Sequence, residues 1–190
     1  MLIDEHLSSY DVVERHQLTI HAPAHAVFDA VRALDLSDSR IVGWLLRLRG
    51  LAGRRRHGRR DDQRLALTLQ NLIASGFIVL DERLDEEIVL GLVGRFWTPH
   101  GGIKRMDTET FAGFASPGYA KAAWNFSLSQ TSEVETKLAT ETRVLCLDDS
   151  SRRKFKLYWR LVAPFSGLIR MEALRSIKRA AEAKAGDRGA

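Results

Sequence analysis

The sequence is poor in cysteine and has no long hydrophobic run. Its single cysteine, Cys146, excludes an internal disulfide, so the fold depends on a packed core and not on covalent cross-links. The longest apolar stretch, Leu161 to Ile169, is much shorter than the about 20 residues that a transmembrane helix needs. The opening MLIDEHLSSYDVVE has two early acids and no apolar core, so it does not read as a secretory signal. We therefore expect a cytoplasmic protein with no transmembrane segment.

Motifs for metal, phosphate and nucleophile chemistry are missing as well. The six histidines include no pair in a metalloprotease arrangement: His21 and His25 are four apart, but HAPAH lacks the glutamate of that motif. With one cysteine this argues against a zinc site. GLVGRF falls inside an expected strand and HGGIKR lacks the spacing of a phosphate loop. No serine lies in a nucleophile elbow. We expect no metal and no cofactor.

The composition is that of a folded domain with a moderate basic excess. The 190 residues are 45% hydrophobic and 28% charged, which predicts one domain over residues 1–190. Part of the net charge of +5 lies in GRRRHGRR, within an aperiodic arginine-rich insertion at about residues 53–64. Such a run can attract an anionic membrane or nucleic acid. No recognition helix or aromatic platform accompanies it, so we expect a solvated loop and no specific nucleic-acid partner.

The hydrophobic periodicity predicts an α+β order of elements. A β-rich strand over residues 12–22 precedes a helix that Pro23 opens. Two short helices, at 41–53 and 65–76, flank the insertion. Strands follow at 77–83 and 86–97, joined in a hairpin around Leu84 and Asp85, and then at 110–115, 119–130 and 134–147. The polar DDSS at 148–151 caps one long C-terminal helix.

The C-terminal helix carries an apolar stripe along its length. At about 100° per residue the stripe includes Phe155, Tyr158, Trp159, Val162, Phe165, Ser166, Ile169, Ala173, Ile177 and Ala180. A curved antiparallel sheet is the natural partner for such a stripe. The first half of the helix is apolar on a second side too, which either the inserted helices or another subunit must cover. Pro164 should kink or break the helix near residue 160, and Gly167 permits a close neighbour. A bent helix over a curved sheet predicts a cavity between them.

This pattern resembles the START/SRPBCC superfamily, in an uncharacterised bacterial branch. The resemblance rests on TIHAPAHAVFDAVRAL as opening strand, turn and first helix, on the strand meander, and on TETRVLCLDDSSRRKFKLYW with PFSGLIR at the end. It implies the helix-grip fold, in which a curved sheet wraps around the long C-terminal helix. It also implies a hydrophobic ligand between the two, or polyketide cyclase-like activity. The extra residues between about 41 and 76 depart from the compact family pattern.

Two polar residues and several aromatic ones are the candidate ligand-binding residues. Glu14 and His16 share a strand face with Leu18 and Ile20, so they project into the cavity if that face does. The alternative, which the pattern favours, is that the strand frays here or that the two side chains partner other polar groups of the core. Arg95 can pair with a ligand carboxylate or point into solvent. The large or apolar side chains expected near the sheet and helix are Trp97, Trp124, Phe126, Tyr158, Trp159 and Val162.

Three functional hypotheses remain open at this stage. The first is binding of a hydrophobic small molecule, lipid- or polyketide-like, in the cavity between helix and sheet. The second is a cyclase-, dehydratase- or hydrolase-like enzyme that uses Glu14 or His16 for proton transfer. The third is an interaction module that binds a partner subunit, as in a homodimer, or an anionic surface.

Alternating charges at Glu135, Lys137, Glu141 and Arg143 predict a solvent-exposed outer surface of the sheet. Cys146 is expected to be buried and inert.

Overall fold

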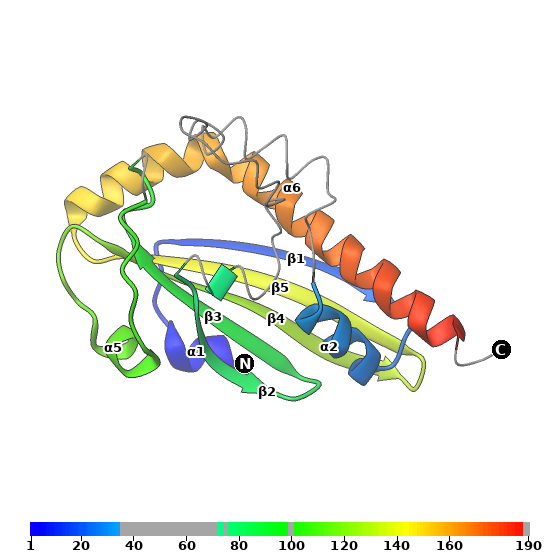
Figure 1. The fold of residues 1–190 in the computed structure, drawn as a ribbon. Helices are drawn as coiled ribbons and strands as arrows, with labels where there is room; N and C mark the ends of the chain where they lie inside the picture. Colours follow the sequence, from blue (N-terminus) through cyan, green and yellow to red (C-terminus); the bar gives the residue numbers. More distant parts are fainter. Residues whose placement is uncertain (35–71, 74–75, 99–100, 188–190) are drawn as a thin grey trace, which may run out of the picture.

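The elements follow the predicted order from strand to helix, strands and a long helix (Figure 1). A computed structural model describes residues 1–34, 72–73, 76–98 and 101–187. The expected helix at 41–53, the arginine-rich insertion and nearly all of the helix at 65–76 lie outside these residues. The helices are α1 (Leu2–His6), α2 (Ala24–Arg32), α5 (Thr108–Gly113) and α6 (Asp149–Asp187), and the strands are β1 (Val12–Ile20), β2 (Ile78–Arg83), β3 (Glu87–Gly94), β4 (Ala120–Ser132) and β5 (Glu135–Cys146).

The five strands form one antiparallel sheet in the order β1-β5-β4-β3-β2. The first strand therefore pairs with the last, with Glu14 opposite Thr142 and Leu18 opposite Leu138. Figure 1 shows the sheet curving beneath α6, which crosses one face along its whole length. This confirms the predicted α+β architecture, with a long C-terminal helix on a curved sheet as in the helix-grip fold.

The face of the sheet toward α6 supplies the larger core. Because side chains alternate along a strand, Ile20 and Leu138 point to this face. They are fully buried together with Ala173, Leu174 and Ile177 of α6, and the apolar side of α2 closes the same cluster. This core fixes the C-terminal half of α6 on the sheet.

The long helix begins at the polar segment that the sequence predicts. The backbone N–H of Ser151 donates to Asp148 Oδ1 at 2.9 Å, and the bond from the Ser151 side chain lowers the pKa of Asp148 to about 2. Pro164 lies inside α6 without breaking it, but Figure 1 shows that the helix changes direction along its length, as expected of an internal proline. In the described part of the chain, no helix is both long enough and apolar enough to span a bilayer.

One predicted strand is wrong. TFAGFA, at 110–115, was expected to be extended, but α5 covers most of it. Asp107 caps this helix, with its Oδ1 accepting from the backbone N–H of Thr110 at 2.8 Å. Phe111 is fully buried against the sheet and orients the short helix. A local cap and one buried ring therefore override a short apolar pattern that also fits a strand.

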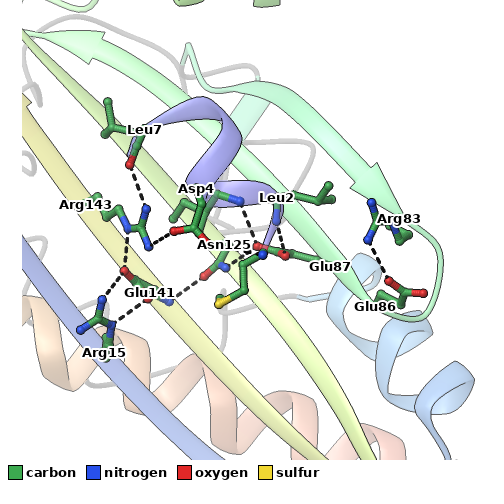
Figure 2. A network of polar contacts seen from close by, with 12 residues as sticks. Leu2, Asp4, Leu7, Arg15, Arg83, Glu86, Glu87, Asn125, Glu141 and Arg143 are labelled. Atoms are coloured by element: carbon green, nitrogen blue, oxygen red, sulfur yellow. Dashed lines mark hydrogen bonds and ion pairs between the residues drawn. The ribbon is translucent and has the colours of Figure 1, made fainter. Parts of the chain in front are cut away.

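The face of the sheet away from α6 is covered in part by α1, a helix that the sequence did not indicate (Figure 2). Glu87 of β3 is buried and accepts from the backbone N–H groups of Leu2 at 2.7 Å and Ile3 at 3.2 Å. It also accepts from Asn125 Nδ2 at 2.6 Å. The carboxylate thus satisfies the first turn of α1 and the neighbouring strand together.

The predicted wet surface at Glu141 and Arg143 is also wrong, because both side chains are buried in a network that joins β1 and β5 to Asp4 of α1. Glu141 accepts from Arg15 at 2.8 and 2.9 Å and from Arg143 at 2.6 Å. Arg143 donates further to the carbonyl oxygen of Leu7 at 2.9 Å and to Asp4 at 2.7 Å. Figure 2 shows these contacts running as a chain from Arg15 through Glu141 and Arg143 to Asp4 and Leu7. Glu141 and Arg143 thus belong to a buried network, whereas Lys137 on the same face is exposed, as predicted.

The role of Glu87 predicts the effect of its removal. Glu87→Ala leaves three donors without their acceptor, and unsatisfied buried donors cost about 1–3 kcal/mol each. We expect chemical denaturation to show a loss of about 3 kcal/mol, and hydrogen exchange at Leu2 and Ile3 to accelerate. Glu86→Ala is the matched control, because the neighbouring Glu86 is exposed and pairs only with exposed Arg83. Equal stability of the two variants would contradict the assigned role.

The Glu141 network predicts a pH dependence of stability. Burial alone would raise the pKa of Glu141, but the bonds from Arg15 and Arg143 outweigh it and hold the pKa below the ordinary 4.5. The carboxylate therefore stabilises the fold above pH 4.5, and this contribution is lost as the pH falls through the lowered folded-state pKa. We expect Glu141→Gln to cost about 3 kcal/mol near neutrality and progressively less in acid.

Urea denaturation at a series of pH values measures this difference. Glu135→Gln, on the same face of β5 but with only exposed contacts to His21 and Thr131 among the described residues, is the control and should show little effect at any pH. A constant difference between Glu141→Gln and the parent protein across the acid range would rule out the charge mechanism.

Candidate functional site

A polar cluster lies between β1, β5 and the middle of α6. Glu14 Oε1 and His16 Nε2 are 2.8 Å apart, and Arg170 of α6 donates from Nη1 to Glu14 Oε2 at 3.1 Å. Arg170 also donates from Nε to Thr142 Oγ1 at 2.9 Å and contacts the hydroxyl of Ser166. Strand alternation and the β1–β5 register put Glu14, His16 and Thr142 on the face that α6 crosses. We call these five residues the polar cluster.

The cluster keeps a charged pair largely out of water. The side chains of Arg170 and Glu14 are 11% and 17% exposed. Burial lowers the pKa of Arg170, and the nearby Glu14 carboxylate offsets only part of this effect. Because the ordinary pKa of arginine lies far above neutrality, the side chain stays charged. A buried guanidinium needs a carboxylate partner, so Glu14 and Arg170 bind α6 to β1.

Gly167 brings the backbone of α6 close to this cluster, as the sequence predicted. A Cβ at this position would lie 2.8 Å from Glu14 Oε1 and 3.5 Å from the His16 ring. Both Glu14 oxygens are already held, Oε1 by His16 and Oε2 by Arg170. Glycine therefore permits an approach that a side chain would obstruct.

The predicted aromatic residues separate into two groups on the same face of the sheet. Trp97, Tyr158 and Trp159 pack around Phe155, with ring centroids 6.5, 5.9 and 5.7 Å from its own. Phe155 itself is buried and was not among the predicted site residues. This group fixes the N-terminal part of α6 to the sheet in a second core.

The other group lies nearer the middle of the sheet. Trp124 and Phe126 have ring centroids 5.0 Å apart, and Trp124 donates from Nε1 to Thr140 Oγ1 at 2.7 Å. Phe126 is buried in the core beneath α6, whereas Trp124 and Val162 of α6 are half-buried. Both therefore border the region between the two cores.

Arg95 is the one predicted site residue that lies apart from the others. It is exposed beyond the end of β3, and its guanidinium stacks over the Tyr119 ring at 4.4 Å from the centroid. The sequence missed Arg170, Thr142 and Ser166. Arg170 lies directly beside the predicted apolar stripe, and that position was the available signal for it.

Two further observations bear on ligands. An open hollow of about 370 Å³ lies partly over the opposite face of the sheet, lined by residues that include Met1, Arg15, Gln17 and Glu141. It is not the cavity that the sequence predicts between helix and sheet, which stays a prediction.

Among the described residues, no group of three or more histidine, cysteine or acidic side chains could hold a metal ion. Burial raises the pKa of Cys146 to about 12, so its thiol is unreactive.

No family model matches the chain, and no curated protein matches it either. Among solved structures, the Zhui aromatase/cyclase from Streptomyces sp. R1128 is 13% identical, over 90% of this chain and 93% of its own, with a TM-score of 0.30. TTHA0849 from Thermus thermophilus is 9% identical over 94% and 100%, with a TM-score of 0.29. The di-domain ARO/CYC StfQ from the steffimycin biosynthetic pathway is 14% identical over 89% and 44%, with a TM-score of 0.28. Likeness at these TM-scores carries no conclusion about function.

The close approach at Gly167 predicts an unusual cost for a glycine-to-alanine change. Alanine inside a helix gains about 1 kcal/mol over glycine. In Gly167→Ala the new methyl group displaces Glu14 Oε1 from His16, and a bond to a charged group contributes about 1.5–3 kcal/mol. We expect thermal and chemical denaturation to show a net loss of about 1 kcal/mol, together with shifted NMR resonances of the His16 ring.

Gly186→Ala near the end of α6 is the matched control, because among the described residues no atom outside the adjoining turns of the helix lies within 4 Å of an added Cβ there. This variant should be as stable as the parent protein or slightly more stable. A gain in stability for Gly167→Ala as well would show that the approach to Glu14 is not tight.

Proposed function

We propose that the chain binds a hydrophobic small molecule, lipid- or polyketide-like, between the middle of α6 and the strands that it crosses. The main observation that supports this proposal is the pattern of side-chain burial along α6. Phe155 is buried at one end, and Ala173, Leu174 and Ile177 are buried at the other. Between them, the sheet-facing Val162, Ser166 and Ile169 are only half-buried. The helix is fixed at both ends and less closely covered in its middle.

The sheet has a matching gradient on the face below. Leu90 and Phe126 are buried, but Val12, Leu92 and Trp124 on the same face are half-buried. Half-buried apolar side chains on two facing surfaces support an apolar space between them. Trp124 would supply a ring wall whose polar nitrogen is already satisfied by Thr140.

The polar cluster would orient the ligand at one end of this space. Arg170 can donate to an acidic or carbonyl oxygen, and His16, which keeps 24% exposure, can exchange hydrogen bonds with a hydroxyl group. The ligand class that fits is therefore amphiphilic, with an apolar body and an oxygen-bearing end. This is the ligand behaviour implied by the START/SRPBCC resemblance, and we infer membership of that superfamily from the helix-grip architecture.

A second candidate function is acid–base catalysis of cyclase, dehydratase or hydrolase type. The observation that favours it is the 2.8 Å contact between Glu14 and His16 on the face toward α6. Because Arg170 holds the second Glu14 oxygen, His16 would be the proton carrier and Glu14 would orient its ring. Loss of water from a bound poly-β-ketone, followed by mass spectrometry, would distinguish turnover from binding; His16→Gln should abolish it.

Filling the space tests the binding proposal. Val162→Trp places a large ring on the sheet-facing side of α6. If the space is open, the variant folds with a melting temperature close to that of the parent protein and no longer binds ligand. We would measure thermal melting with oleate and with an anthraquinone carboxylic acid; at 100 times the dissociation constant, a bound ligand stabilises the parent protein by about 2.7 kcal/mol.

Leu161→Trp is the matched control, because Leu161 is exposed on the outward side of the same turn. It should keep any ligand-induced shift. A melting curve for the parent protein that neither compound shifts, together with a loss of about 1–3 kcal/mol in Val162→Trp from overpacking, would indicate that helix and sheet are packed solidly.

A further inference from the structure

The outward side of α6 carries a row of exposed apolar side chains. Leu157, Leu161, Phe165 and Leu168 are 65%, 70%, 36% and 50% exposed. Their spacing of four, four and three residues puts them on one side of the helix, turned about 100° around its axis from the sheet-facing line of Phe155, Val162 and Ile169. Phe165, which the sequence assigned to the sheet-facing stripe, is therefore exposed instead. We call this row the outer stripe. Large apolar residues that lie singly on a surface need no explanation, but a continuous row does.

The same part of the helix is strongly basic. Arg153, Lys154, Lys156 and Arg160 are all exposed within the first turns of α6. The sequence from Ser150 to Met171 contains no aspartate or glutamate, so no acid within this stretch offsets the charge. An apolar row flanked by basic side chains complements a surface that is both anionic and apolar below its charges.

We propose that the outer stripe and these four basic residues bind an anionic membrane surface, with α6 lying along the plane of the lipid headgroups. The leucine and phenylalanine side chains enter the headgroup–acyl boundary. The basic side chains extend around them to lipid phosphates, because long lysine and arginine stems can bury their methylene groups while the charge stays in water. The bend of α6, seen in Figure 1, makes the side of the helix away from the sheet convex.

The charges favour lipid over the other possible occupants. A second copy of this chain offers no acidic side chain between Ser150 and Met171, so packing α6 against α6 would leave the four basic residues without complementary charge. RNA would satisfy the charges but would leave the leucines in water, because aliphatic side chains make no stacking platform for bases. An anionic membrane satisfies both features. This inference does not depend on the proposed ligand, since the outer stripe is exposed and shares no residue with the half-buried side of α6 that faces the sheet.

Flotation with lipid vesicles tests the proposal on the full chain. The probes are vesicles of phosphatidylcholine alone and vesicles with about a third phosphatidylserine. We expect binding to the anionic vesicles that weakens with added salt, and binding to the neutral vesicles that is at least about tenfold weaker. Leu157→Ser/Leu161→Ser and Lys156→Gln/Arg160→Gln should each lower the affinity for anionic vesicles about tenfold or more.

The control for the apolar change is Leu84→Ser/Val134→Ser, which replaces two similarly exposed residues on β-turns away from α6. This variant should bind as the parent protein does, and all variants should keep its melting temperature. Three results would overturn the proposal: no binding to anionic vesicles at low salt, binding that survives both α6 changes and so belongs to another basic part of the chain, or a solution dimer that Leu157→Ser/Leu161→Ser dissociates. Loss of vesicle binding with an unchanged oleate melting shift would separate this surface from the proposed ligand site.

Discussion

The buried pair of Arg170 and Glu14 is the constraint on which the helix–sheet arrangement depends. A guanidinium with little exposure must have a carboxylate partner, and that partner lies on the strand at the edge of the sheet. Rotation of α6 about its axis, or a shift along it, would separate the pair and leave two charges poorly solvated. The middle of the helix is therefore fixed by polar contacts, while apolar cores fix its two ends.

The side of α6 that faces the sheet and the side that faces away from it differ in their chemistry. The side toward the sheet has half-buried apolar residues around an oriented group of hydrogen-bonding side chains, which suits an amphiphilic ligand. The side away from the sheet combines exposed leucines with basic residues. The opposite face of the sheet is occupied differently again, because the buried network of Glu141 and Arg143 joins α1 to it there. Under the proposed function, a sheet held from behind by that network would be preorganised for a ligand on its other face.

Local sequence signals predicted the elements well wherever the cause was local. The β2–β3 hairpin was placed correctly around Leu84 and Asp85, and Asp85 adopts a positive φ of 59° at the turn. The DDSS cap and the close approach at Gly167 were also predicted. TFAGFA failed because a six-residue apolar pattern fits a strand and a short capped helix equally well, and the Asp107 cap decides between them.

The features that sequence could not predict depend on contacts between distant parts of the chain. Glu141 and Arg143 look like surface residues until α1 docks over them. Arg170 and Glu14 are separated by 156 positions, and their contact depends on how α6 is placed over β1. Periodicity showed that Glu14 and His16 share a face with core residues, but it gave no partner for them. Side-chain pairing across a helix–sheet layer is set by three-dimensional register, which one sequence does not specify.

The central claim is that a guest molecule lies between the middle of α6 and the sheet. Intermolecular NOEs between bound oleate and the methyl groups of the protein would locate that guest directly. The account predicts contacts to Val162, Ile169 and Leu92, on the two facing surfaces. Contacts confined to Ala139, beside the hollow on the far face, or to the outward-facing Leu157 and Leu161, would contradict it.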